Sequence, residues 1–220
     1  MAQIYRSLQD QAYINLQEMI MNEELDAETV YSETKMAKEM NISRTPFRAA
    51  LVRLSQDKYI DIIPSKGFKV HVPDDRDIET TFQIRTAVES YCAVLLNEQK
   101  DQEDARATIE KMQCSQDEMQ CIAEKEDNKR FQELDRIFHS ELILYAHNEE
   151  FTKLYDFSIY HQIVSLSKKS SFTTEEKIIT CREHDAILKA IKKGPVGECY
   201  FAVSAHMKTN KENSIANMKK

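Results

Sequence analysis

The chain is poor in the residues that interrupt helices. Its 220 residues include only 3 Gly and 4 Pro, which argues against a loop-rich β protein and for a mostly helical one. It also lacks an apolar run long enough to span a membrane, and its N-terminus lacks the charged-then-apolar layout of a signal peptide. We therefore expect no membrane partner. At this length the chain can form two modest domains or one large one.

Paired cysteines are also missing. The five cysteines are odd in number, and no two form a C-x-x-C pair. This pattern is typical of reduced thiols in a cytoplasmic protein, where a cysteine more often fills core space than binds a metal. We therefore expect a cytoplasmic location.

An overall excess of basic charge is absent as well, since the net charge is −7 and the pI is about 5.5. The distribution of charge is uneven, however. Residues 35–69 contain eight basic and three acidic residues, a balance of +5, whereas residues 1–34 contain one basic and seven acidic residues. Basic charge is therefore concentrated in one short segment, as a DNA-facing surface requires.

That basic segment contains the stretch Asn41 to Leu54, which predicts the recognition helix of a helix-turn-helix. Ser43 is the expected N-cap, and Pro46 is tolerated in the first turn, where an N–H has no intrahelical partner to lose. Arg44 and Arg48 lie one turn apart and can face outward together, where arginine binds O6 and N7 of guanine. An ordinary amphipathic helix with two solvated arginines is the alternative. The expected buried stripe is formed by Phe47, Ala50, Leu51 and Leu54.

The neighbouring segments favour a winged helix. Helical patterns over Leu8–Met21 and Glu33–Met40 precede the recognition helix, which gives three helices with a short middle one. The stretch Tyr59–Val72 has two β-rich runs around a turn that contains Gly, and it predicts a hairpin. A hairpin directly after a recognition helix is typical of a wing. Lys66 and Gly67 at its tip suit contact with phosphates or the minor groove.

Beyond a polar joint at residues 73–77, which contains Pro, nearly all of the chain has a helical pattern. We place the domain boundary at this joint, between residues 1–73 and 74–220. The expected fold class is mostly α, with an N-terminal winged helix-turn-helix followed by an all-α antiparallel helical bundle. Six helices are predicted in the second domain, over residues 78–99, 102–124, 128–146, 150–167, 174–193 and 197–216.

Helical spacing in the second domain indicates a possible metal site. Asp135 and His139, at i and i+4, project from one helical face, and His184 and His206 each share a stripe with apolar residues on later helices. Three imidazoles and one carboxylate in one core would bind a first-row transition metal and leave positions open for water or a small oxyanion. Glu183 or a buried hydroxyl could orient the imidazoles. Core histidines that are hydrogen-bonded without any metal are the alternative.

With these residues identified, residues 9–72 resemble the winged helix of the GntR superfamily. The matching run is Ser43-Arg44-Thr45-Pro46-Phe47-Arg48, then Ala50-Leu51 and Arg53-Leu54. In that superfamily the matching arginines and a basic residue on the preceding helix read bases, and wing residues enter the minor groove. An acid usually follows the second arginine, where this chain has Ala49. The resemblance implies DNA contacts at Lys35, Ser43, Arg44, Thr45, Arg48, Lys66 and Gly67.

Residues 78–214 resemble the FCD effector domain of the FadR-like subfamily. The matching motifs are Ile84-Arg85-Thr86-Ala87-Val88-Glu89, Asp135-Arg136-Ile137-Phe138-His139, Asn148, Glu183-His184 and His206-Met207. Relatives that keep the Asp and all three His bind a divalent metal, whose coordination a small carboxylate completes. The resemblance therefore implies a Zn, Ni or Mn ion held by Asp135, His139, His184 and His206. It also implies effector contacts at Arg85 and Asn148.

These implications describe a metabolite-responsive DNA-binding transcriptional regulator, expected to act as a repressor. Residues 1–73 would bind DNA, and residues 74–220 would bind the effector and dimerise. A homodimer would grip a pseudo-palindromic operator, because two-fold protein symmetry is mirrored in the DNA. A metal-free regulator of a larger apolar effector, such as a fatty acyl compound, is the alternative. A metalloenzyme is a further rival, but it needs a general base beside the metal, and the sequence singles out none.

Overall fold

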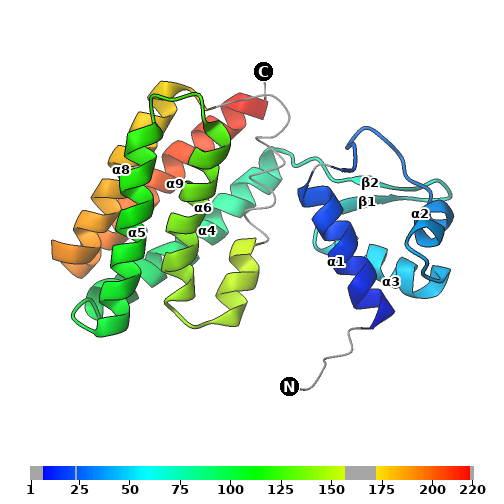
Figure 1. Cartoon of the computed structure of the whole chain (residues 1–220), viewed down its shortest axis with the longest axis horizontal. Coiled ribbons are helices and arrows are strands. Elements are labelled where there is room, and N and C mark those ends of the chain that lie inside the picture. The colour runs from blue at the N-terminus through cyan, green and yellow to red at the C-terminus, as the bar shows by residue number, and fades with distance from the viewer. Residues whose placement is uncertain (1–6, 23, 157–171, 219–220) are drawn as a thin grey trace. The chain divides into compact units, whose positions relative to one another are not determined.

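The computed structural model describes residues 7–22, 24–156 and 172–218. The chain divides into two compact units, Met1–Val72 and Pro73–Lys220, and each is described by itself (Figure 1). The division falls one residue before the predicted boundary. Within the described ranges, no helix is long and apolar enough to cross a membrane.

The first unit is a three-helix winged helix (Figure 1). Its elements are α1 (Leu8–Met21), α2 (Glu33–Glu39), α3 (Arg44–Gln56), β1 (Ile60–Ile63) and β2 (Gly67–Val70). The two strands pair in antiparallel register, with Ile60 opposite Val70 and Ile63 opposite Gly67. Tyr31 extends the sheet through an isolated bridge to Phe68. The predicted order of helices and hairpin is confirmed.

Aromatic packing attaches the hairpin to α3. Phe68 is fully buried, and its ring centroid lies 5.7 Å from that of Tyr31 and 6.4 Å from that of Phe47. The rest of the predicted α3 stripe is also fully buried, so the i, i+3, i+4, i+7 pattern is confirmed. Leu8, in the first turn of α1, is 52% exposed.

The second unit consists of helices in the order that the sequence predicts. They are α4 (Asp75–Glu98), α5 (Glu103–Ile122), α6 (Asn128–Leu144), α8 (Thr174–Lys193) and α9 (Val196–Met218), with a further helical stretch at residues 149–156. The helix predicted over residues 150–167 lies outside the described residues beyond position 156.

The expected joint at residues 73–77 requires a correction, because α4 already begins at Asp75. The Asp74 side chain accepts hydrogen bonds from the backbone N–H groups of Arg76 and Asp77, and the Asp77 side chain accepts one from the Asp74 N–H. This reciprocal capping box satisfies N–H groups at the helix start, and acidic residues are favoured at that end of a helix. The charged stretch is therefore a helix start rather than a linker.

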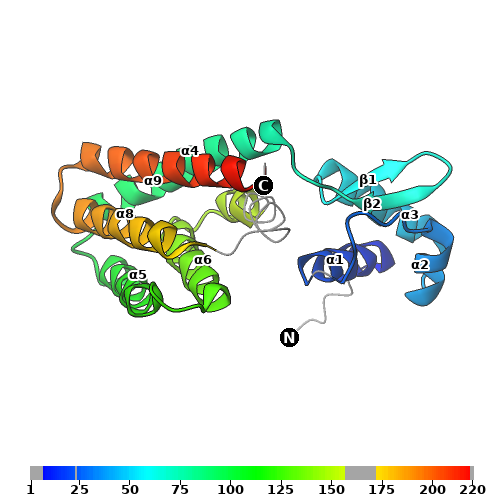
Figure 2. The ribbon, with the colours of Figure 1, turned by 90° about the horizontal axis from the view of Figure 1, so that it is seen from above.

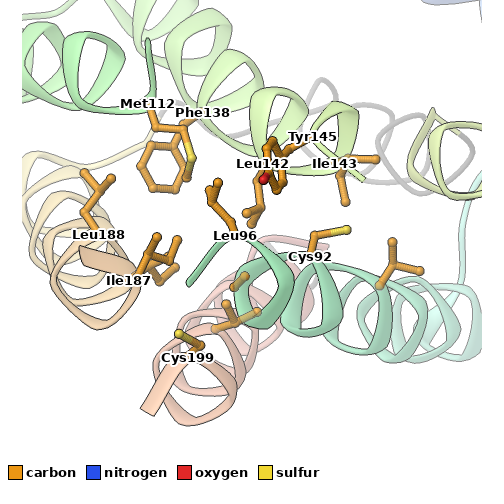
Figure 3. Close-up of a cluster of buried hydrophobic side chains, with 14 of the residues drawn as sticks. Cys92, Leu96, Met112, Phe138, Leu142, Ile143, Tyr145, Ile187, Leu188 and Cys199 are labelled. Carbon is orange, nitrogen blue, oxygen red and sulfur yellow. The ribbon is translucent and has the colours of Figure 1, made fainter. Parts of the chain in front are cut away.

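The helices of the second unit pack around a main apolar core, and a smaller cluster lies where α5, α6 and α8 meet. α4 and α9 lie side by side, and α8 contacts both α9 and α5 (Figure 2). Figure 3 shows the apolar side chains that α4, α5, α6 and α8 contribute, among them Leu96, Met112, Phe138 and Ile187. Asn97 ties two of these helices together by donating to the carbonyl oxygens of the last turn of α8. This packing brings the inner faces of α6, α8 and α9 together.

Candidate functional site

The turn between α2 and α3 exposes the start of the recognition helix. Asn41 adopts a φ of 53°, in the left-handed region that Asn tolerates better than most residues. The Ile42 N–H then donates to the Ala37 carbonyl, 2.9 Å away, which closes the end of α2. Ser43 stands at the N-cap position of α3, but its side chain makes no capping hydrogen bond. Its exposed hydroxyl is therefore available to a partner.

The predicted base-reading side chains lie on the surface. Arg44, Thr45, Arg48 and Lys35 are all exposed. Two of them form long ion pairs, with Arg48 Nη1 3.9 Å from Glu33 Oε2 and Lys35 Nζ 3.9 Å from its i+4 acid. The Lys35 pair is exposed on both sides and contributes at most about 1 kcal/mol, whereas the Glu33 side chain is only 13% exposed. DNA can therefore replace the Lys35 pair at small cost.

Arg53, on the same helix, has a different environment. Its guanidinium lies 4.1 Å from the centre of the Tyr13 ring and 3.2 Å from Asp10 Oδ1, both on α1. Tyr13 also donates a hydrogen bond to Asp57. These contacts join α1 to α3, so Arg53 contributes to the packing of the unit.

The two predicted wing residues differ. Lys66 is exposed at the tip, as a phosphate contact requires. Gly67 is buried, with a φ of 133°, and a Cβ atom there would overlap the carbonyl oxygen of Tyr31. The fold thus needs glycine at this position to let the wing pack beneath Tyr31. Contact of Gly67 with the minor groove stays a prediction.

In the second unit, the four predicted metal ligands come together. The Nε2 atoms of His139, His184 and His206 form a triangle with sides of 3.3, 3.3 and 3.2 Å. Asp135 Oδ1 lies 3.5 Å from His184 Nε2 and 3.8 Å from His139 Nε2. All three rings are fully buried, whereas the aspartate side chain is 15% exposed. Among the described residues, this group has the composition and spacing of a metal site.

Two outer carboxylates fix the orientation of two of these rings. Glu89 Oε2 lies 2.6 Å from His139 Nδ1, and Glu183 Oε2 lies 2.9 Å from His206 Nδ1. Burial by itself would raise the pKa of Glu89, but Arg85 and His139 lower it to about 2. Ionised Glu89 can only accept a hydrogen bond, so His139 Nδ1 carries the proton, and the Glu183 contact favours the same tautomer of His206. The Nε2 lone pairs of both rings are then directed at the centre of the triangle.

His184 is held by aromatic stacking. Its ring lies parallel to that of Phe138, with the centroids 4.0 Å apart and an interplanar angle of 2°. Burial, reinforced by His206 and His139, holds the pKa of His184 well below its usual value, so the ring is neutral. Burial likewise lowers the pKa of His206, although Glu183 opposes this. A neutral imidazole is the form that binds metal ions.

The donor set fits a divalent transition metal. Corners of a triangle with such sides can all lie about 2.0–2.1 Å from one point, the usual Zn–N distance. The Nε2 lone pairs of His139 and His206 point to one place, 3.3 Å or less from His184 Nε2, where a cation could bind all three rings. Imidazole nitrogen with one carboxylate oxygen suits Zn, Ni or Mn.

The two predicted effector contacts lie in different environments. Arg85 is buried, and its Nε donates to Glu89 Oε1 at 2.7 Å. It therefore contacts the carboxylate that holds His139. Asn148 is exposed, and its Oδ1 accepts from the Glu150 N–H, at the start of the helical stretch 149–156. The structure does not bring Asn148 into the cluster, because its side chain caps a helix instead.

Three residues near the site were missed by the sequence reasoning. Glu89 and Phe138 stand in the motifs that matched the FCD domain, but neither was given a role. The i, i+4 spacing of Arg85 and Glu89 was a usable signal of a buried ion pair. The third is Asn210, whose Nδ2 lies 3.0 Å from His206 Nε2. Its position one turn after His206, on the same helical face, was a usable signal.

Comparison with known proteins agrees with this architecture. Residues 8–70 match the bacterial regulatory proteins of the gntR family, and residues 80–209 match the FCD domain. The HTH-type transcriptional regulator YdhC of Bacillus subtilis strain 168 is 26% identical over 184 residues, which cover 83% of this chain and 80% of YdhC. The Nta operon transcriptional regulator of Aminobacter aminovorans is 26% identical over 180 residues, 80% of each chain. E. coli McbR/YncC has the same fold, with a TM-score of 0.68, 19% identity and coverage of 96% of this chain and 98% of that one.

A winged helix followed by an FCD domain defines a DNA-binding transcriptional regulator with an effector domain. The chain belongs to the GntR family of bacterial regulatory proteins and carries an FCD domain. The resemblance noted in the sequence is therefore confirmed. The rival reading as an enzyme is wrong, because the family and its relatives are transcriptional regulators.

Proposed function

We propose that this regulator is a homodimeric, cytoplasmic repressor whose FCD domain binds one divalent metal ion and a small carboxylate effector. The N-terminal unit would bind DNA, and the FCD unit would bind the effector and dimerise. The observation that carries the proposal is the convergence of three buried imidazole nitrogens, 3.2–3.3 Å apart, beside the Asp135 carboxylate. An apolar effector would leave these three buried, converging ring nitrogens without a partner of its own, and a buried polar group without a partner is costly.

The surface of the first unit supports direct reading of an operator. Arg44 and Arg48 are exposed on one helix, and each can donate two hydrogen bonds to a guanine edge in the major groove. Lys35, on α2, would add a further base contact, and Lys66 would add a phosphate contact, which gives salt-dependent affinity without sequence discrimination. In a dimer, two such helices would read two half-sites of a pseudo-palindrome.

The buried network supports a link between the effector and the ligand shell. The metal ion would supply a Lewis-acidic position for one carboxylate oxygen. Arg85 holds Glu89 at 2.7 Å, and Glu89 holds His139 at 2.6 Å. An anion that contacts Arg85 would therefore act on the position of a metal ligand through one carboxylate. Such differential contacts are what bias one dimer arrangement over another.

Elemental analysis and a DNA-binding assay test the proposal together. Protein purified without an affinity tag should carry close to one transition-metal ion per chain, and a chelator should remove it. The protein should shift the promoter of its own operon in a gel, and small carboxylates should weaken the shift only when the metal is present. Light scattering should give the mass of a dimer. A protein with well below one metal ion per chain, released by a fatty acyl compound, would establish the metal-free alternative instead.

A further inference from the structure

Asn210 lies beside the candidate ligands without being one of them. It is on α9, one turn after His206, and only 7% of its surface is exposed. Its side-chain Nδ2 lies 3.0 Å from His206 Nε2, the nitrogen that faces the other two imidazoles. A buried amide in contact with a metal-facing atom needs an explanation, since a buried polar group is costly unless it is hydrogen-bonded.

The direction of this hydrogen bond follows from the neighbouring carboxylate. His206 donates from Nδ1 to Glu183, so its Nε2 carries a lone pair and can only accept. The amide of Asn210 therefore faces His206 with its NH₂ group. This agrees with the 3.0 Å contact between Asn210 Nδ2 and His206 Nε2. A metal ion bound by His206 takes that same lone pair. The Asn210 N–H then loses its acceptor while it remains buried.

A buried donor that loses its acceptor costs about as much as a lost hydrogen bond, so a new acceptor must replace the old one. The atoms that arrive with the metal ion are the oxygens of whatever occupies its open position. We propose that Asn210 donates to a carboxylate oxygen of the metal-bound effector and so selects small oxyanions at that position. This inference rests on the metal site proposed above, and it assigns to Asn210 a recognition role that depends on the metal.

A second buried asparagine shows what a purely structural amide does in this domain. Asn97 directs its Nδ2 at main-chain carbonyl oxygens of Ala190 and Ile191, and thereby ties α4 to the end of α8. Asn210 instead directs Nδ2 at a side chain of the ligand cluster. The difference in partners supports a role in ligand binding rather than in helix packing.

The test measures two affinities by calorimetry in the full-length protein. Zn²⁺ alone is titrated first, and acetate is then titrated into the Zn²⁺-loaded protein. In Asn210→Leu, Zn²⁺ affinity should stay within about threefold of the wild type, because no ligand is lost. Acetate affinity should fall on the order of tenfold or more, the size of one hydrogen bond to a charged group. Asn213→Ala, three residues along the same helix at a partly exposed position, is the matched control and should change neither value.

If Asn210→Leu loses its helical circular dichroism signal, Asn210→Asp is a second test variant, because it preserves the size of the side chain. It removes the donor and adds a negative charge, so acetate affinity should fall at least as far while Zn²⁺ affinity holds or rises. Unchanged acetate affinity in both variants would overturn the inference. A tenfold loss of Zn²⁺ affinity in Asn210→Leu would also overturn it, by making Asn210 a direct ligand. If the wild-type protein binds no Zn²⁺ in the first titration, the proposed metal site itself is wrong. That outcome is distinct from a failure of the inference about Asn210, which the acetate titration tests.

Discussion

The two units place their functional side chains in opposite environments. In the winged helix, Arg44 and Arg48 stand in water, and the closest acid to Arg48 is 3.9 Å away. In the FCD domain, the three imidazoles are fully buried, and two of them are held by carboxylates at 2.6 and 2.9 Å. One unit exposes its DNA-reading groups with at most long ion pairs, whereas the other holds its binding groups in fixed positions.

The difference follows from what each unit binds. DNA brings its own phosphates and base edges, so exposed arginines lose only water and weak ion pairs when they dock. A metal ion brings no orienting groups, so its ligands must be positioned beforehand by outer partners such as Glu89 and Glu183. We therefore expect mutations in the FCD site to change metal affinity by moving the ligands. Mutations of the exposed DNA-reading residues (Lys35, Arg44, Thr45 and Arg48, here called the reading surface) should each remove a single contact with DNA.

Loss of an imidazole should have the largest effect. In His184→Ala, metal affinity should fall by more than the roughly 10–100-fold that loss of an outer partner costs, because a ligand itself is removed. DNA affinity without effector should stay at the wild-type value. Calorimetry and a gel shift measure the two. His71→Ala, which removes a histidine paired with Asp61 in the winged helix, should leave metal affinity unchanged. Equal metal affinity in both variants would show that the imidazole cluster is not the site.

The second prediction tests whether the orientation of a ligand ring affects metal affinity when all the ligands are still present. Glu89→Gln should lower metal affinity by about 10–100-fold, because the neutral amide holds His139 less firmly and leaves Arg85 without its charge partner. Glu79→Gln, on the same helix but at the surface beside Lys211, should leave it unchanged. Thermal unfolding separates the two explanations. If Glu89→Gln lowers the melting temperature while the folded protein binds metal normally, Glu89 is only a structural partner of Arg85.

Local signals predicted most of the fold. The bounds of α1 and α8 agree with the sequence prediction residue for residue, since apolar spacing and capping residues such as Thr173 mark both. The start of α4 was predicted three residues late, because its capping box uses Asp74 and Asp77 instead of the commoner Ser or Thr with Glu. That choice made a helix start resemble a charged linker.

The candidate site was less accessible to sequence reasoning. The i, i+4 spacing relates Asp135 to His139 on one helix, but their meeting with His184 and His206 depends on how three helices pack. Family resemblance, not spacing, supplied that convergence. Glu89 was overlooked because its partner His139 lies fifty positions away. Asn148 was predicted as an effector contact, but its exposed side chain caps a local helix start.

On the reading surface, Arg44→Ala should cost about 1–3 kcal/mol of discrimination for each base pair that the arginine reads. The loss should appear on the operator and not on unrelated DNA. Arg53→Ala is the control from the same helix. It removes the stacking on Tyr13 and the pair with Asp10, so it should lower the melting temperature but keep the sequence preference. Footprints that do not change in Arg44→Ala would end the base-reading assignment.

The smallest effect separates a phosphate contact from a base contact within the wing. Lys66→Ala should weaken binding to operator and to unrelated DNA by the same factor, and it should reduce the slope of log K against log salt by about 0.9. Lys66 is exposed at the tip, so the fold should not change. The adjacent Gly67 offers the contrast: Gly67→Ala would force a Cβ against Tyr31 and disturb the wing itself. If Lys66→Ala leaves the salt slope unchanged, the wing tip does not touch a phosphate. The DNA contacts of this unit would then be confined to α2 and α3.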